Sequence, residues 1–365
     1  MSPLAVFWLT ERLQMLNKDQ VQNLESGATA IQAGGSVTVV TVGVTAAEVR
    51  QIALDVAKGT FYELTGAAKE TASARVEEIT DQVIKKLERD FPAGLQKAKD
   101  PDFQYALYTV QKEFARNGDK DLGDLLVDLI VDRSKQDQRD ILQIVLNESL
   151  ATAPKLTDTH LAALAAIFLF RHTQDHRITN HQTFGDHLDK HLLPFVSKLS
   201  KGLAGYQHLQ FSGCGSIGLA GRRLEGILGT VYQGQFLKGF DRSEIEDRSI
   251  SVGVDSRFFI PCLNDATKWQ VNANSKESLE KYLDTQQVCP EDRAKIIGLF
   301  DLGKMSESEI KEELIAIRPY MADVFDVWAN SPMQTFTLTS VGMAIGHANI
   351  KRLIGEFANL SIWIN

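Results

Sequence analysis

The sequence predicts a mainly α-helical protein with an N-terminal β-hairpin, a helical bundle, and a small glycine-rich α+β C-terminal part. Apolar residues recur at helical spacing over most of residues 45–200. Residues 28–44 carry no charge and are rich in β-branched side chains, which is typical of strands. Glycines are dense between Gly202 and Gly239, which favours turns and short elements there. We therefore expect three parts, formed by residues 1–44, 45–200 and 201–365.

In the first part, Val6, Leu9, Leu13 and Leu16 predict a helix over residues 3–25. The uncharged segment that follows predicts a hairpin that turns at Gly34 and Gly35. A hairpin this small is marginally stable alone, and no Lys or Pro protects its edges. We therefore predict that it is the oligomerisation element and that the chain forms homo-oligomers. The side chains expected to make this contact are those of Ile31, Val37, Val39, Val40 and Val42.

The second part begins with a capping box at Thr45 and Glu48, and Pro92, Pro101 and Gly118 mark later breaks between helices. Residues 161–170 are apolar on nearly all sides, so we expect them at the buried centre of the bundle. An acidic stripe runs along one helix at spacings of 3, 4 and 4. Its members are Asp121, Asp124, Asp128 and Asp132. We expect a solvated outer face there, and the alternative is a nuclease site in which these carboxylates hold divalent cations.

The third part holds a formal GxGxxG match at Gly213–Gly218, without the clear preceding strand and directly following helix of a dinucleotide site. We expect a tight turn there instead. Residues 335–365 read as strand, helix and strand, a pattern compatible with a winged-helix-like unit. In such a unit Lys351 and Arg352 would lie on or after the helix, where a phosphate contact is conceivable, but ordinary surface charge is the preferred interpretation.

Six of the eight histidines lie between His160 and His191, and two pairs have helical i, i+4 spacing. These pairs, His172 with His176 and His187 with His191, are candidate metal ligands. Neither pair has the HExxH pattern, and the residues between them resemble a loop. We predict that the segment holds no metal and that the protein needs no cofactor.

Composition narrows the class of protein further. The 365 residues include 47 acidic and 39 basic side chains, for a formal charge of −8, and 44 % are apolar. This mixture is typical of a folded chain, and its acidity argues against nucleic acid as the partner. The longest apolar stretch is about half the roughly 20 residues needed to span a membrane. The N-terminus lacks a signal-peptide pattern, and the three cysteines are widely spaced, so we expect a cytoplasmic protein.

Several segments together resemble a family of bacterial conserved-hypothetical proteins known by locus tags. The segments are Ile31–Gly35, Thr45–Asp55, Asp119–Asp132, Leu142–Leu150, Tyr206–His208, Gly213–Gly215, Lys238–Phe240, Leu338–Gly342 and Ser361–Ile364. The N-terminal segment is also similar to segments attached to proteins of bacterial conflict and phage defence. These resemblances imply no catalytic residues.

The sequence as a whole favours a non-enzymatic, oligomeric interaction or scaffold protein of a bacterial cell, with a role in anti-phage defence. Its expected partner is itself, and another protein is a further candidate. One alternative is a metal-dependent hydrolase or nuclease effector that uses the histidine cluster. A second alternative is a DNA-binding regulator that acts through the C-terminal unit.

Overall fold

Short polar caps define where the helices of the first half begin. The computed structural model describes residues 44–58 and 64–365. Asp100, Asp119 and Asp140 each accept a hydrogen bond from a backbone N–H of the first turn of α4, α5 and α6, respectively. Gly118 ends α4 with a positive φ of 68°, a conformation that glycine adopts without strain. These caps agree with the helix boundaries that the sequence indicates.

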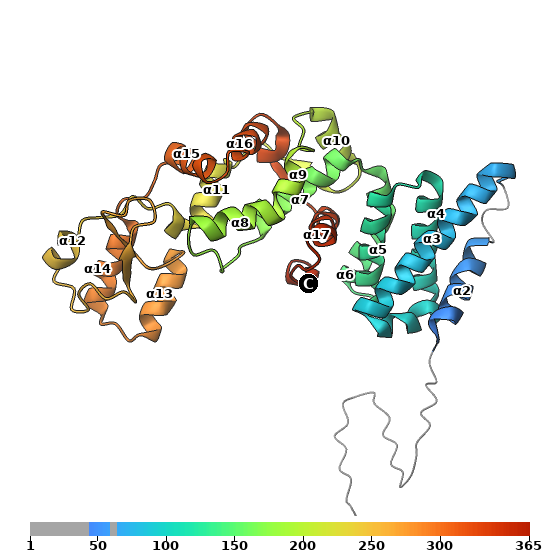
Figure 1. The fold of residues 1–365 in the computed structure, drawn as a ribbon, viewed down its shortest axis with the longest axis horizontal. Helices are drawn as coiled ribbons and strands as arrows, with labels where there is room; N and C mark the ends of the chain where they lie inside the picture. The colour runs from blue at the N-terminus through green and yellow to red at the C-terminus, as the bar shows by residue number, and fades with distance from the viewer. Residues whose placement is uncertain (1–43, 59–63) are drawn as a thin grey trace, which may run out of the picture. The chain divides into compact units, whose positions relative to one another are not determined.

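The described residues are mainly helical (Figure 1). The α-helices are α2 (Ala46–Lys58), α3 (Gly66–Asp90), α4 (Pro101–Asn117), α5 (Lys120–Ser134), α6 (Ile141–Thr152), α7 (Asp158–His172), α8 (His181–His191), α9 (Leu193–Val196), α10 (Leu203–Phe211), α11 (Leu224–Val231), α12 (Ser243–Asp247), α13 (Lys276–Thr285), α14 (Pro290–Asp301), α15 (Glu307–Ile317), α16 (Met321–Ala329) and α17 (Ser340–Ile354). Short 3-10 turns cover Pro92–Lys99, Ala153–Lys155, Gln233–Gln235, Pro332–Gln334 and Leu360–Ile362.

Within this part of the chain, the strands form two small antiparallel sheets. In one sheet β1 (Gly215–Ile217) pairs with β4 (Phe336–Leu338), and Ser216 lies opposite Thr337. In the other sheet β2 (Phe259–Pro261) pairs with β3 (Trp269–Val271). Both sheets fall within residues 201–365, where the sequence predicts an α+β part.

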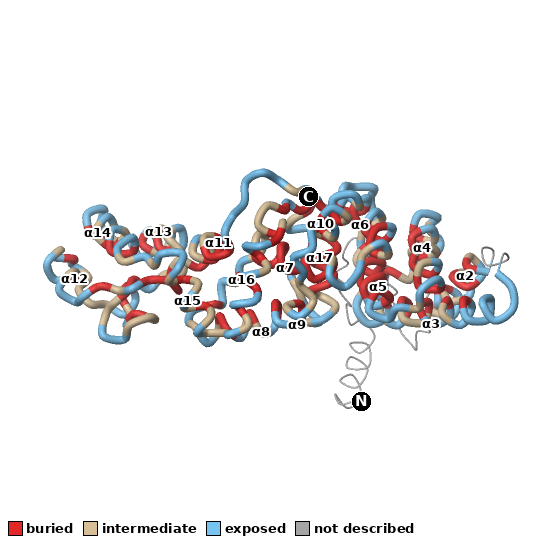
Figure 2. The backbone as a smooth tube through the Cα atoms, turned by 90° about the horizontal axis from the view of Figure 1, so that it is seen from above, coloured by how far each residue is buried: buried red, intermediate tan, exposed pale blue. Residues whose placement is uncertain are grey.

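The main hydrophobic core is organised around α7. Every residue from Leu161 to Phe170 is buried, which confirms the prediction of a buried central helix (Figure 2). Helix α17 lies against α7, and a Cβ atom at Gly346 would come within 2.8 Å of the Leu164 carbonyl oxygen. The absence of a side chain at Gly346 therefore permits the close approach of these two helices. Because α17 comes from the C-terminal part, the main core is continuous across residue 200.

A second, smaller core lies around β2 and β3 and the helices α12–α14. It contains Leu237, Phe240, Ile245, Ile250, Phe258, Phe259, Val271, Leu279, Leu283, Ile296, Leu299 and Phe300. The glycine-dense segment that leads from the main core into this smaller one includes Gly234, where a Cβ atom would lie 1.9 Å from the Ala273 carbonyl oxygen. A larger residue could not occupy this position without moving the backbone.

One predicted element is wrong. The strand expected at the end of the chain is instead the 3-10 turn Leu360–Ile362, so residues 335–365 do not form a strand–helix–strand unit. The Trp363 indole N–H donates to the His172 carbonyl oxygen at 2.6 Å, and its ring lies 5.0 Å from that of Phe168. Packing of this aromatic ring onto α7 overrides the β-type local pattern.

Among the described residues, no helix combines the length and the apolar character that crossing a membrane requires. The helix predicted over residues 3–25 and the hairpin with Ile31, Val37, Val39, Val40 and Val42 lie outside the described residues.

Candidate functional site

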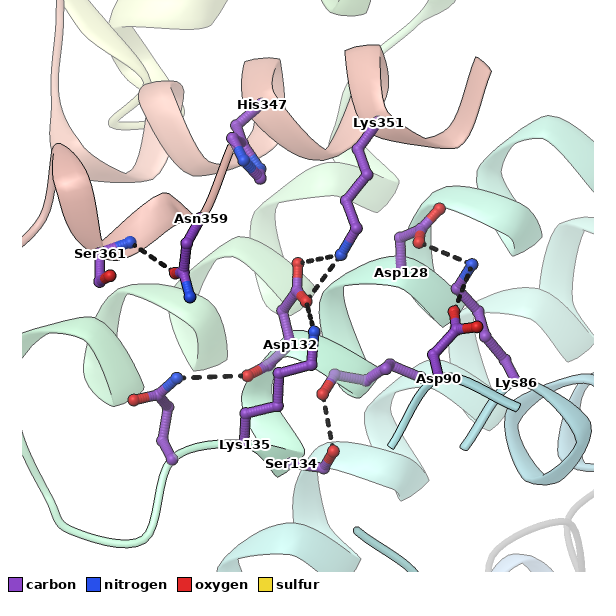
Figure 3. A network of polar contacts seen from close by, with 12 residues as sticks. Lys86, Asp90, Asp128, Asp132, Ser134, Lys135, His347, Lys351, Asn359 and Ser361 are labelled. Atoms are coloured by element: carbon purple, nitrogen blue, oxygen red, sulfur yellow. Dashed lines mark hydrogen bonds and ion pairs between the residues drawn. The ribbon is translucent and has the colours of Figure 1, made fainter. Parts of the chain in front are cut away.

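A cavity of about 370 Å³ lies between α5, α6, α17 and the segment that follows α17 (Figure 3). We call it the α5–α17 pocket. Its polar lining is Asp132, Lys135, Gln136, His347, Lys351, Asn359 and Ser361, and its apolar lining is Leu142, Leu146, Phe357, Ala358 and Leu360. The pocket therefore combines fixed charges with an apolar wall, a combination found in small-molecule sites.

Asp132 is the central charge of the pocket. The Lys351 Nζ lies 2.7 and 2.8 Å from the two Asp132 carboxylate oxygens, and the Lys135 Nζ lies 2.7 Å from one of them. Burial acts to raise the pKa of Asp132, but Lys351 and Lys135 outweigh it and hold that pKa below its usual range. Asp132 is therefore ionised at neutral pH, and both ammonium groups contact its Oδ1 atom.

His347 lies on α17 one turn before Lys351, and only 2 % of its surface is exposed. Its Nε2 lies 2.6 Å from the Ala358 carbonyl oxygen. A carbonyl oxygen only accepts, so Nε2 carries the proton and Nδ1 is left as an acceptor. Nδ1 has no hydrogen-bond partner in the structure. Burial lowers the pKa of His347, which keeps the ring neutral.

The acidic stripe is the solvated face that the sequence predicts only at Asp121 and Asp124, which are exposed. Asp124 is exposed, but Asp128 is only 3 % exposed and lies 2.9 Å from the Lys86 Nζ. Burial raises the pKa of Asp128. The reason for the error is that α3 and α17 both pack against α5, and each brings cations to the stripe. Asp121, Asp128 and Asp132 are thus ion-paired to cations of α3 or α17, whereas Asp124 is exposed.

The basic pair at the end of α17 belongs to the same set of contacts. Lys351 pairs with Asp132, while the Arg352 Nη1 lies 3.4 Å from Asp121 and its Nε donates to the Asn349 side chain at 2.8 Å. Neither residue is the ordinary surface charge that we expect from sequence. Both residues position α17 against the bundle. A phosphate group would therefore have to compete with Asp132 and Asp121 for these two cations.

The four histidines that the sequence offers as candidate metal ligands do not come together at one site. The rings of His187 and His191 lie with their centroids 4.3 Å apart and are tilted by 32°, and the His187 Nδ1 lies 3.3 Å from an Asp175 carboxylate oxygen. Burial lowers the pKa of His187 to about 4. His172 stacks on Phe168, and His176 lines a different cavity of about 360 Å³. Over residues 44–58 and 64–365, no group of three or more His, Cys, Asp or Glu is arranged to hold a metal ion.

The GxGxxG match is a turn and a short strand. Gly215 begins β1, where a Cβ atom would lie 2.5 Å from the Thr337 carbonyl oxygen, and the helix that a dinucleotide site needs does not follow. Cys214 is buried, and burial raises the pKa of its thiol to about 12. Gly213 has a positive φ of 76° in the turn before β1, so the segment forms the tight turn that the sequence predicts, while Gly215 permits the close approach of β4. The raised pKa of its thiol means that Cys214 is not an activated nucleophile.

Three large apolar side chains are exposed on α10 and in the loop after β1. We call this set the α10 patch and define it by Leu203, Phe211 and Leu219. Phe211 is 89 % exposed and Leu219 is fully exposed. Leu203 and Phe211 are eight residues apart, so they lie on the same face of α10. The loop is held in place because the N–H groups of Gly218 and Arg222 donate to the Thr335 and Gln334 carbonyl oxygens at 3.0 and 2.8 Å.

Sequence reasoning missed both the pocket and the patch. No local motif marks His347 or Lys135, because the pocket forms only when α17 packs on α5. The sequence does contain a pattern that indicates the patch, since residues 202–221 contain no Asp, Glu, Lys or Arg.

The fold and these sites define a mainly helical protein with an ion-paired pocket and an exposed apolar patch. Residues 43–364 match the model of a protein family that is named after a locus tag. The chain therefore belongs to this family. No curated protein and no solved structure matches the chain.

Proposed function

We propose that this protein is a non-enzymatic interaction protein that associates with further copies of itself, and that the α10 patch is one of its contact surfaces. The proposal rests on one observation, the exposure of Phe211 and Leu219 within a segment that has no charged residue. Interface centres are depleted of charge and enriched in aromatic side chains. Large apolar side chains that gather on an exposed surface mark contact sites more often than scattered ones.

A second copy of the chain is the partner that the charge favours. The protein carries a formal charge of −8, so two copies repel one another unless the contacting surfaces avoid acidic groups. Residues 202–221 bring no acidic group of their own to such a contact, and the charged residues that flank them in sequence are Lys201 and Arg222. A symmetric contact through the α10 patch would cover the same surface on both copies.

The experiment measures mass by analytical ultracentrifugation and native mass spectrometry at micromolar concentration. We expect an oligomer for the unmodified chain and a lower oligomeric state for Phe211→Lys combined with Leu219→Lys. Tyr105→Lys is the matched control, because Tyr105 is a single exposed aromatic residue on α4, away from the patch in sequence. A monomeric unmodified chain would contradict self-association, and an unchanged assembly of the double variant would contradict the role of the patch.

The uncharged N-terminal segment is the other candidate contact, and the same experiment tests it separately. Val39→Lys combined with Val40→Lys should also lower the oligomeric state while leaving the helical circular dichroism nearly unchanged. Comparison of the oligomeric states of the two double variants shows which surface mediates self-association.

We further propose a role in anti-phage defence, which rests only on the resemblance of the N-terminal segment. Plaque assays on cells with and without the protein test this role. Equal plaque numbers across a phage panel would contradict it.

A further inference from the structure

We propose that the α5–α17 pocket binds a small monocarboxylate that has an apolar body and a hydrogen-bond donor. This ligand site is independent of the self-association proposed above, since it uses none of the residues of the α10 patch. The proposal rests on the charged side chains of the pocket (Figure 3), on the unpartnered nitrogen of His347, and on the apolar wall.

The lysines keep donors free for an anion. An ammonium group has three N–H donors. Lys351 uses at most two of them on Asp132, and Lys135 uses one. The remaining donors are next to a cavity that these same two residues line. Two cations and one carboxylate leave the pocket with a net charge of +1, which one carboxylate group of a ligand would neutralise.

His347 supplies the second, independent observation. Its Nδ1 is an acceptor without a donor, in a side chain that is 98 % buried, and His347 lines the pocket. A buried polar atom without a partner destabilises the structure. Figure 3 shows the ring reaching from α17 toward the space between Asn359 and Lys351. An O–H or N–H of a ligand in this space would give Nδ1 the partner that it lacks.

The apolar wall distinguishes a carboxylate ligand from a free phosphate. Leu142, Leu146, Phe357 and Leu360 line one side of the cavity. Its volume of about 370 Å³ lies within the range of small-molecule sites, roughly 300–1,000 Å³. A phosphate dianion would leave this wall uncovered and would place excess negative charge beside Asp132. A carboxylate on an apolar body satisfies the lysines and the wall together.

Isothermal titration calorimetry on the full-length protein tests the proposal with chosen probes. The probes are the three hydroxybenzoate isomers, benzoate, 4-hydroxybenzamide and inorganic phosphate. We expect at least one hydroxybenzoate to bind more tightly than benzoate, because only the former offers a hydroxyl donor. We expect 4-hydroxybenzamide, which has no charge, and phosphate to bind at least tenfold more weakly.

Three variants separate a binding site from a structural ion pair. Lys351→Met and Lys135→Met should each weaken binding about tenfold, whereas Asp132→Asn should strengthen it several-fold because it releases both ammonium groups. Lys281→Met is the control, since Lys281 pairs with Glu277 on α13 and does not line the pocket. If Lys351→Met fails to fold, Lys135→Met carries the test, because Lys135 is exposed and lies just after the end of α5.

Three results would overturn the proposal. The first is the absence of binding by every carboxylate probe at millimolar concentration. The second is binding that all three pocket variants leave unchanged. The third is phosphate binding tighter than that of every carboxylate, which would reject the proposed ligand class.

Discussion

Removal of the Asp128 carboxylate should destabilise the bundle far more than its position in an acidic stripe suggests. Asp128 is 3 % exposed, and its oxygen lies 2.9 Å from the Lys86 Nζ. Breaking one side of a buried ion pair costs about 3–5 kcal/mol, because the other charge is left buried. Lys86 is 20 % exposed and retains Asp90 at 3.4 Å. We therefore expect the lower end of that range, about 3 kcal/mol, for Asp128→Ala.

The measurement is urea denaturation followed by circular dichroism at pH 7. Asp124→Ala is the matched control on the same helix, because Asp124 is exposed and should change the stability by no more than about 0.5 kcal/mol. Replacing both partners, as in Lys86→Met with Asp128→Leu, should recover most of the loss, since an apolar pair avoids the desolvation of two charges. An Asp128→Ala variant as stable as Asp124→Ala would refute the reasoning.

The remaining predictions concern α17 and the histidines. Gly346→Ala should lower the free energy of unfolding by about 1–3 kcal/mol, because the new Cβ atom would press on the Leu164 carbonyl oxygen. Gly298→Ala should raise it by about 0.5–1 kcal/mol, because the space around Gly298 is open. Urea denaturation measures both effects. The pKa of His187 is lowered from 6.5 to about 4, so the unfolded chain binds its proton first as the pH falls. The stability should then decrease by about 3 kcal/mol between pH 7 and pH 4. His187→Gln should remove this part of the pH dependence, and an unchanged profile would contradict the shift.

Local patterns predicted the helices well because their signals lie within a few residues. The capping box at Thr45 and Glu48 is present, with the Thr45 N–H donating to the Glu48 carboxylate at 2.8 Å. Gly118 ends its helix, and the apolar run at residues 161–170 is the buried centre. In each case the physical cause, a cap or a hydrophobic face, is contained in the local sequence.

The candidate sites were harder to predict because their parts come from distant segments. Asp128 and Asp132 have the spacing of a solvated helix face, and only the packing of α3 and α17 on α5 buries them. His347 acquires its role from Ala358 and from the cavity beside it. Periodicity gives the face of a helix on which a residue lies but does not give the number of neighbours that cover that face.

By itself the sequence determined the helical class, the helix ends, and the tight turn at Gly213–Gly218. Each of these depends on the conformational preferences of neighbouring residues. The tertiary structure decided the place of α17 against α7, the burial of Asp128 within the acidic stripe, and the pocket between Asp132, His347 and Lys351. These features depend on long-range packing, in which one C-terminal helix supplies the cations and the neutral histidine that face carboxylates on α5 more than 200 residues earlier in the chain.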